Sequence, residues 1–264
     1  MKNDKRFSNY PLSSEKKWAA YFWSLLEKAL ELHAEKQTHF ANPRQQQIAK
    51  DLLGRFSGIR SSFFGGYPEA ERVKIHVCPQ ALPGGGEEKT IACLMVKGSF
   101  PEGILTHRDF LGALLGLGIK REMIGDIIYR GGEKAFVFLE KELVPFVKTN
   151  FRKAGLFTVE TEEIGLDELE AGFEPQCVKQ IKGTVASMRL DAVAGLGFGL
   201  SRSKIAPLIK GEQMKINYQL VSRPSQLVKE GDLISLTGRG RLEVVEKRGK
   251  SRKGRTHLLL HRII

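Results

Sequence analysis

The residues best placed to do chemistry are cations at the start of a short helix near the C-terminal end of the sequence. Ser201 is a residue type that caps helices, and Arg202 and Lys204 follow within the first turn. The free backbone N–H groups of a first turn and the helix dipole already favour anions. Cations clustered at such a start favour binding of a polyanion over the alternative of a solvated charged face.

Two short helices and a small twisted sheet are expected to hold this site. A helical repeat begins at Leu190, and a run of glycines is expected to break it, namely Gly195, Gly197 and Gly199. The second helix is expected to end at Gly211, and Pro207 should kink or shorten it at a cost of about 3 kcal/mol. The alternation that follows predicts a tight hairpin at Asn217-Tyr218.

More cations recur along this module and in a basic segment near its end. From Lys247 to Arg255 six of nine residues are cationic, and glycines there predict a flexible loop between a strand ending near Glu246 and one starting near Thr256. Such a loop would add affinity more than specificity. The residues predicted to contact this polyanion are Arg189, Ser201, Arg202, Ser203, Lys204, Lys210, Lys215, Asn217, Arg223, Lys229, Arg239, Arg241, Lys247, Arg248, Lys250, Arg252, Lys253 and Arg255.

Residues 189–235 resemble the S4-type RNA-binding domain, also called the alpha-L motif. The matching motifs follow the order and spacing of that family, and they are Arg189-Leu190-Asp191, Ser201-Arg202-Ser203-Lys204, Leu208-Ile209-Lys210-Gly211, Lys215-Ile216-Asn217 and Glu230-Gly231-Asp232. The resemblance implies a module that contacts an A-form RNA helix or junction through phosphates and 2′-hydroxyls.

The distribution of charge supports an anionic partner. The chain has 264 residues, enough for two or three compact domains, and a net charge of +12. From Arg189 to Ile264 there are 16 Lys and Arg against 6 Asp and Glu, so this part holds most of the excess. Such asymmetry indicates nucleic acid or an anionic membrane surface. The longest apolar stretch, Phe110 to Ile119, is about half of a membrane-spanning length, and no signal peptide is expected.

The remainder of the chain predicts an α+β arrangement. Helices are expected at 14–36, at 42–53 with a capping box, at 107–118 and at 143–153. Strands are expected at 91–96, 127–129, 135–139 and 157–161, and the order β-α-β-β-α-β is that of the alpha-beta plait, with an extra strand at 73–77 in front. The predicted domains are a helical N-terminal module at 1–72, an alpha-beta plait (ferredoxin-like) domain at 73–172 and an S4-type domain at 173–264.

The middle of the chain resembles the YlmH-type RNA-binding proteins. The motifs are the run from Thr106 to Glu122, Gly125-Asp126-Ile127, Asn42-Pro43-Arg44 and Phe63-Phe64-Gly65-Gly66-Tyr67. In that family a helical piece, a plait and an S4-type domain occur in this order. The resemblance implies a factor of ribosome-associated quality control that joins the large ribosomal subunit carrying a stranded peptidyl-tRNA, and it also implies a link to cell division.

Motifs that suggest other chemistry lack the residues it requires. His107-Arg108-Asp109 is kinase-like, but Leu114 stands where the catalytic-loop asparagine is needed. Lys134 replaces a stacking ring on the plait, so that surface is not expected to read bases. The six histidines and three cysteines show no metal spacing, so no metal or cofactor is expected. The cysteines, which are Cys78, Cys93 and Cys177, fit reduced thiols in a cytoplasmic protein.

The sequence thus predicts a non-enzymatic, monomeric protein that binds structured RNA, with rRNA, a tRNA and the large ribosomal subunit as partners. The alternative is an RNA-modifying enzyme of pseudouridine synthase or methyltransferase type, because S4-type domains accompany both. The candidate synthase aspartate, Asp191, already belongs to the RNA-binding motif, and the glycines at 84–86 open no helix, as a methyltransferase loop would. Membrane binding would need a basic amphipathic helix with exposed apolar anchors, which is not found.

Overall fold

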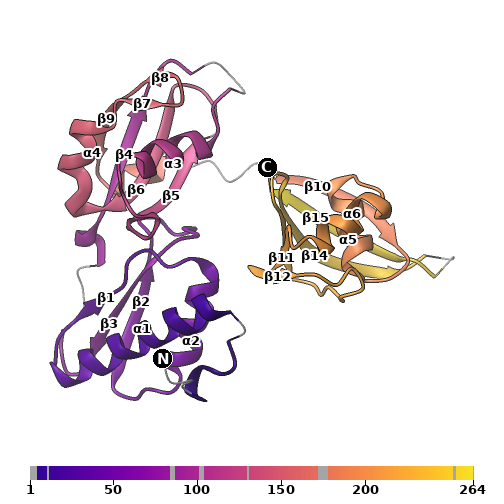
Figure 1. Cartoon of the computed structure of the whole chain (residues 1–264), viewed down its shortest axis with the longest axis horizontal. Helices are drawn as coiled ribbons and strands as arrows, with labels where there is room; N and C mark the ends of the chain where they lie inside the picture. Colours follow the sequence, from indigo (N-terminus) through magenta and orange to yellow (C-terminus); the bar gives the residue numbers. More distant parts are fainter. Residues whose placement is uncertain are drawn as a thin grey trace. The chain divides into compact units, whose positions relative to one another are not determined.

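A computed structural model describes residues 5–10, 12–83, 87–100, 104–129, 131–171, 178–251 and 254–263. The chain divides into two compact units, Met1–Phe173 and Glu174–Ile264 (Figure 1). Both units combine helices with antiparallel sheets, which confirms the predicted α+β class. The first two predicted domains fall within unit 1, and their separation at residue 72 stays a prediction. No helix in the described ranges has the length and apolar composition needed to cross a membrane.

The first part of unit 1 packs two helices against a three-stranded sheet. The helices are α1 (Ser13–Glu31) and α2 (Pro43–Leu53). The strands, in spatial order, are β1 (Lys36–Gln37), β3 (Lys74–Pro79) and β2 (Ile59–Phe64). Apolar side chains from both layers are fully buried between them, among them Phe22, Leu26, Ile48, Leu52, Ile75 and Val77.

Two predictions for this part have opposite outcomes. The capping box is confirmed, because the Asn42 side chain accepts from the Gln45 N–H at 3.0 Å and the Gln45 side chain accepts from the Asn42 N–H at 2.8 Å. The strand expected at 73–77 as an extra plait strand pairs instead with β1 and β2. That placement was wrong, because alternation identifies a strand but not its distant partner. The part is a helix–sheet layer and not only a helical module.

The second part of unit 1 is the predicted alpha-beta plait. Its sheet has four antiparallel strands, in the spatial order β5 (Ile124–Tyr129), β6 (Lys134–Glu140), β4 (Ile91–Lys97) and β9 (Glu160–Ile164). Helices α3 (His107–Gly116) and α4 (Val144–Asn150) pack on this sheet (Figure 1). The core between them includes Leu94, Phe110, Leu114, Val137 and Val147. This strand order is the one that the β-α-β-β-α-β connectivity produces.

The end of the plait differs from the prediction. The strand expected at 157–161 is divided into β8 (Phe157–Thr158), which forms a short hairpin with β7 (Lys153–Ala154), and the sheet strand β9. Gly155 makes the hairpin turn with a φ of 57°. Unit 1 also contains short 3-10 helices, which are η1 (Lys5–Phe7), η2 (Glu87–Thr90), η3 (Arg121–Met123), η4 (Lys141–Leu143) and η5 (Asp167–Ala171).

The turn after β2 closes part of the plait face that the helices leave open. Gly66 in this turn has a φ of 101°, and a Cβ there would lie 2.5 Å from the Phe138 ring. The Tyr67 ring packs on Phe138 with 4.9 Å between centroids, and its hydroxyl donates to Asp126 at 2.9 Å. The Phe-Phe-Gly-Gly-Tyr segment therefore joins the first sheet to the second.

Buried polar contacts strengthen this joint. Asp126 on β5 also accepts the N–H groups of Glu71 and Arg72, at 2.6 and 3.2 Å. Lys74 on β3 forms an ion pair of 3.1 Å with Glu140 at the end of β6, and both side chains are almost fully buried. Because a buried charge without a partner is costly, these pairs hold the two sheets in one arrangement.

Unit 2 is a six-stranded antiparallel sheet covered by two helices. The helices are α5 (Leu190–Phe198) and α6 (Arg202–Lys210), and their core with the sheet includes Val193, Ile205, Ile209, Ile234, Leu242 and Leu260. The strands, in spatial order, are β10 (Val178–Val185), β15 (Thr256–Ile263), β14 (Gly240–Lys250), β13 (Leu233–Leu236), β11 (Met214–Ile216) and β12 (Gln219–Val221).

Three predictions for unit 2 need correction. Helix α5 is not broken at Gly195 or Gly197, and it ends at Gly199, whose φ of 66° is left-handed. A Cβ at Gly197 would lie 2.1 Å from the Leu242 side chain, so this glycine permits close helix–sheet packing. Helix α6 continues past Pro207 to Lys210, so it is not shortened. Strand β14 continues to Lys250, so the first four residues of the expected basic loop, 247–250, are strand.

Two other predictions are confirmed. Asn217 and Tyr218 form the two-residue turn between β11 and β12, with φ values of 47° and 66°. Positive φ at both central residues is the geometry that tight hairpins favour. Cys78 and Cys93 are buried free thiols, as expected, whereas Cys177 lies outside the described residues.

The variant Gly66→Ala should destabilise unit 1 by about 2–4 kcal/mol, because the added methyl group meets Phe138 and the φ is strained for alanine. Urea unfolding followed by tryptophan fluorescence measures this, since both tryptophans, Trp18 and Trp23, belong to unit 1. The control is Gly112→Ala in α3, where a Cβ meets nothing within 4 Å and a gain of up to about 1 kcal/mol is expected. Equal effects of the two changes would contradict the close contact.

Candidate nucleic-acid interface

The first turn of α6 carries the cations that the sequence singled out. Ser201 occupies the N-cap position, and its carbonyl oxygen accepts from the N–H groups of Lys204 and Ile205, both at 3.0 Å. The sequence predicted that the Ser201 side chain caps the helix, but it makes no capping hydrogen bond. Its hydroxyl oxygen lies 2.9 Å from that of Ser203. Arg202, Ser203 and Lys204 are exposed. The Ser201 hydroxyl therefore does not occupy the N–H groups of the first turn, although the Lys204 N–H is bonded to the Ser201 carbonyl oxygen.

A buried carboxylate connects this turn with the start of α5. Asp191 accepts two hydrogen bonds from the Arg189 guanidinium, at 3.2 and 3.0 Å, and one from Arg202 at 3.5 Å. Burial alone would raise the pKa of Asp191, but the two guanidinium groups outweigh it and hold the pKa below its usual range. We call Arg189, Asp191, Arg202, Ser203 and Lys204 the helix-end cluster.

Helix α5 has its own N-terminal N–H groups already occupied. The N–H groups of Leu190 and Asp191 donate to the carbonyl oxygens of Gln226 and Pro224, at 2.8 and 3.1 Å. These hydrogen bonds place the 224–226 backbone beside the helix-end cluster. The exposed Arg223 immediately precedes that segment. The first turn of α6, and not that of α5, is therefore the helix start that can receive an anion.

Asn217 has a structural contact that the sequence did not predict. Its amide donates to Asp232 at 2.8 Å, and its side-chain oxygen accepts the N–H of Leu233 at 2.9 Å. Asp232 also accepts the N–H of Lys229 at 2.7 Å, while the Lys229 side chain is exposed. The Asn217 side chain thus fastens the hairpin to the start of β13.

Other predicted cations lie on the opposite face of the sheet. Lys215, Ser235 and Arg241 are paired in one row across β11, β13 and β14. The neighbouring row, Ile216, Ile234 and Leu242, belongs to the core under the helices. Because side chains alternate between faces, Lys215 and Arg241 project from the face away from the core, which we call the outer sheet face. The predicted cations are therefore divided between two surfaces.

The remaining candidates lie at the ends of elements. Lys210 ends α6, and Arg239 lies in the turn between β13 and β14; both are exposed. Arg255 donates to the hydroxyl and the carbonyl oxygen of Thr184, at 2.9 and 2.7 Å, which anchors the β14–β15 hairpin to β10. On β14, Lys247, Arg248 and Lys250 are exposed, and Arg248 pairs with Glu246 at 2.8 Å. Arg252 and Lys253 lie outside the described residues.

The fold and the cluster define unit 2 as an RNA-binding module of the S4 class, and residues 188–234 match the sequence model of the S4 domain. Residues 90–168 match the model described as "Putative RNA-binding domain in YlmH". The chain is 32% identical over 234 residues to the ribosome-associated protein quality control protein P2 of Bacillus subtilis (strain 168), covering 88% of this chain and 89% of that protein. The chain belongs to the YlmH family.

Two further similarities agree with this family. Small ribosomal subunit protein uS4 of Dechloromonas aromatica (strain RCB) is 40% identical over 70 residues, covering 23% of this chain and 34% of that protein. The solved structure of cell division protein ylmH from Streptococcus pneumoniae has a TM-score of 0.51 and 23% identity, covering 60% of this chain and 94% of that chain. The latter supports the fold.

The sequence placed Asp191 in the RNA-binding motif Arg189-Leu190-Asp191, but its contact with the two arginines was not predicted. Its role depends on Arg202, which lies eleven residues away in sequence and on another helix. Among the described residues, no group of three or more potential ligands is placed to hold a metal ion.

The variant Asp191→Asn tests whether the carboxylate positions the arginines. It removes a negative charge, so charge alone would strengthen RNA binding. Loss of the ion pairs should instead weaken binding by about threefold to tenfold, because both guanidinium groups lose their fixed orientation. A filter-binding titration with ribosomal RNA shows whether the affinity of the variant falls or rises.

The matched control is Glu243→Gln on β14, which removes the same charge outside the helix-end cluster. RNA binding of this control should stay equal or increase slightly. Tighter binding by both variants would show that only the total charge matters.

Proposed function

We propose that this chain is a non-catalytic protein that binds structured ribosomal or transfer RNA on the large ribosomal subunit, acting as a monomer in ribosome-associated quality control in the cytoplasm. The observation that carries the proposal is the helix-end cluster, in which two arginines are ordered around Asp191 beside a helix start. The name of the Bacillus subtilis relative supports the ribosomal setting.

The geometry suggests how the cluster would hold RNA. Guanidinium groups donate in a planar fork that suits phosphate oxygens, and the first-turn N–H groups of α6 add further donors. A-form RNA presents phosphates and 2′-hydroxyls across a shallow minor groove, so a compact cationic surface can bind it by shape. The binding would need no rearrangement of the two arginines, since Asp191 already fixes them.

The outer sheet face and the β14–β15 hairpin would add a second, weaker contribution. Their cations are spaced along strands and some are already paired, as Arg248 is with Glu246 and Arg255 with Thr184. Exposed charges of this kind attract phosphates over a Debye length without fixing register. The helix-end cluster would therefore determine which RNA structure is bound, and the outer cations would mainly increase the rate at which RNA associates.

Combined removal of charge by Arg202→Ala and Lys204→Ala should weaken association with ribosomal subunits steeply. Each phosphate contact contributes about −0.7 to −0.9 to the slope of log K against log salt, so the slope should flatten by about 1.5. Co-sedimentation across a salt series measures both the affinity and the slope.

The matched control replaces Lys16 and Lys17, on α1 of unit 1, by alanine. It changes net charge equally and should leave the slope nearly unchanged. Equal losses from the two pairs would contradict the assignment, and nucleoside-modifying activity in the purified protein would favour an enzyme instead.

The pair Lys215→Ala and Arg241→Ala, on the outer sheet face, should lose less affinity than the cluster pair.

A further inference from the structure

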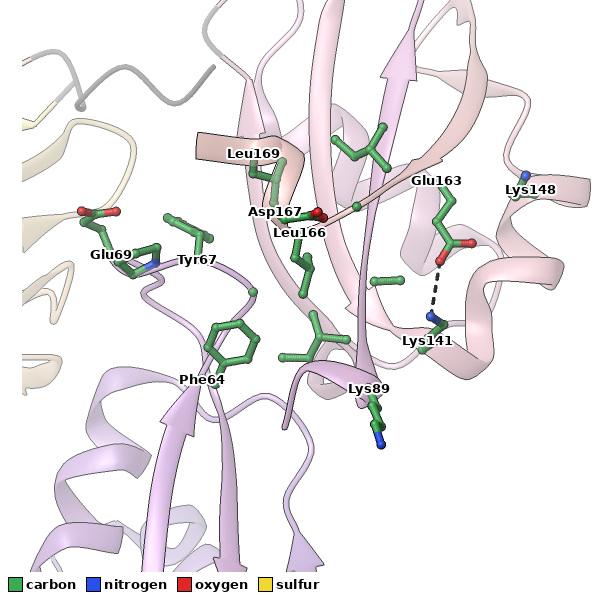
Figure 2. A pocket seen from close by; sticks show the side chains of 16 residues that line it. Phe64, Tyr67, Glu69, Lys89, Lys141, Lys148, Glu163, Leu166, Asp167 and Leu169 are labelled. Atoms are coloured by element: carbon green, nitrogen blue, oxygen red, sulfur yellow. Dashed lines mark ion pairs between the residues drawn. The ribbon is translucent and has the colours of Figure 1, made fainter. Parts of the chain in front are cut away.

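Unit 1 contains a groove that the RNA-binding proposal does not use. It has a volume of about 1230 Å³ and lies between the turn after β2, the edge of the plait sheet and η5 (Figure 2). Its floor is made of buried residues, which are Gly66, Ile91, Ala92 and Leu169. Its walls are partly exposed and are made by Phe64, Tyr67, Ile164, Gly165 and Leu166.

The walls suit aliphatic side chains better than nucleic-acid bases. Base stacking needs an open aromatic face, and the Tyr67 ring is restricted because it packs on Phe138 and its hydroxyl is bound to Asp126. The aliphatic members of the floor and walls, Ile91, Ala92, Ile164, Leu166 and Leu169, outnumber the two rings. Three lysines and three acidic residues also line the groove, so the site combines an apolar floor with a charged rim.

Exposed charges at the rim are segregated. Lys89, Lys141 and Lys148 come from η2, η4 and α4 and lie on one side, whereas Glu69 and Asp167 lie toward the other (Figure 2). Among the described residues that line the groove, Glu163 is the carboxylate nearest these lysines, and it lies 3.9 Å from Lys141. The lysine side is therefore complementary to an anionic ligand, and its charges can set the orientation of that ligand.

The net charge of the plait region does not favour RNA as that ligand, although residues 90–168 match the model of a putative RNA-binding domain. These residues contain ten Lys and Arg against twelve Asp and Glu, so net charge alone gives the domain no attraction for a polyanion. An occupant must match one cationic rim and an apolar floor at the same time. A protein segment that alternates apolar and acidic side chains has this chemistry, because successive side chains of an extended peptide point to opposite sides.

We propose that this groove is a docking site for an extended acidic and apolar segment of a partner protein. The apolar side chains of the segment fill the floor between Tyr67 and Leu166, and its carboxylates face Lys89, Lys141 and Lys148. The site is independent of the helix-end cluster, so it goes beyond the proposed RNA-binding function.

Fluorescence anisotropy of the full-length chain with labelled short peptides tests the proposal. The probes are a peptide alternating leucine with glutamate, the same peptide with lysine for glutamate, and one with serine for leucine. The leucine–glutamate peptide should bind at least about tenfold more tightly than either of the others. Binding of the lysine peptide with equal affinity would overturn the proposal.

Rim variants locate the binding. Lys89→Glu combined with Lys148→Glu should weaken the leucine–glutamate peptide by about tenfold and leave RNA binding unchanged. The matched control, Lys120→Glu with Lys153→Glu, reverses two exposed charges of the plait outside the groove and should leave peptide binding unchanged. If the rim variant instead weakens binding of a labelled oligouridylate, the groove binds RNA and the proposal is wrong.

Discussion

One buried carboxylate orders the charged surface of unit 2. Asp191 is 7% exposed and lies between the guanidinium groups of Arg189 and Arg202. A carboxylate in this position is stable only with paired cations, and the same pairing restricts two long side chains that would otherwise sample many rotamers. A phosphate ligand then meets donors that are already ordered and costs less conformational entropy to bind. Under the proposed function, the arrangement of these charges, and not only their sum, is expected to determine the affinity.

The surrounding structure holds Asp191 in place. Its N–H and that of Leu190 are bonded to carbonyl oxygens of the 224–226 segment, which fixes the start of α5. Further along the helix, Gly197 allows α5 to approach Leu242 on β14 more closely than any side chain would permit. The segment itself is tied to the N-terminal side of the helix by the Val228 N–H, which donates to Met188 at 2.8 Å. The helix is thus fixed at its start and along its length.

The sequence predicted correctly those local features that depend on residues close together in the chain. The Asn42 capping box, the Asn217-Tyr218 turn and the cationic first turn of α6 depend on residues within a few positions, and each was found where expected. The errors concern distant contacts. Gly197 resembles a helix breaker until Leu242 is known to lie against it, and the basic segment at 247–250 resembles a loop until its pairing with β15 is known.

The same limit applies to the candidate site. Composition identified the cations but could not tell which face of the sheet each one occupies, because that depends on the register of β11, β13 and β14. It also could not show that Asn217 is engaged by Asp232, or that Arg255 is anchored at Thr184. A list of basic residues therefore predicts that a domain binds a polyanion, and the strand register is needed to find where.

The two units differ in net charge. Under the proposed function, the main electrostatic contribution to RNA affinity is expected from residues 189–264, where cations exceed acids by 16 to 6, because residues 90–168 carry slightly more acids than cations. The sheet face on which RNA-reading plaits stack bases is also partly used for internal packing here, since Gly66 and Tyr67 cover Phe138. A base cannot reach that ring without displacing the turn. The proposed docking groove of unit 1 lies beside this covered face and does not require the turn to move.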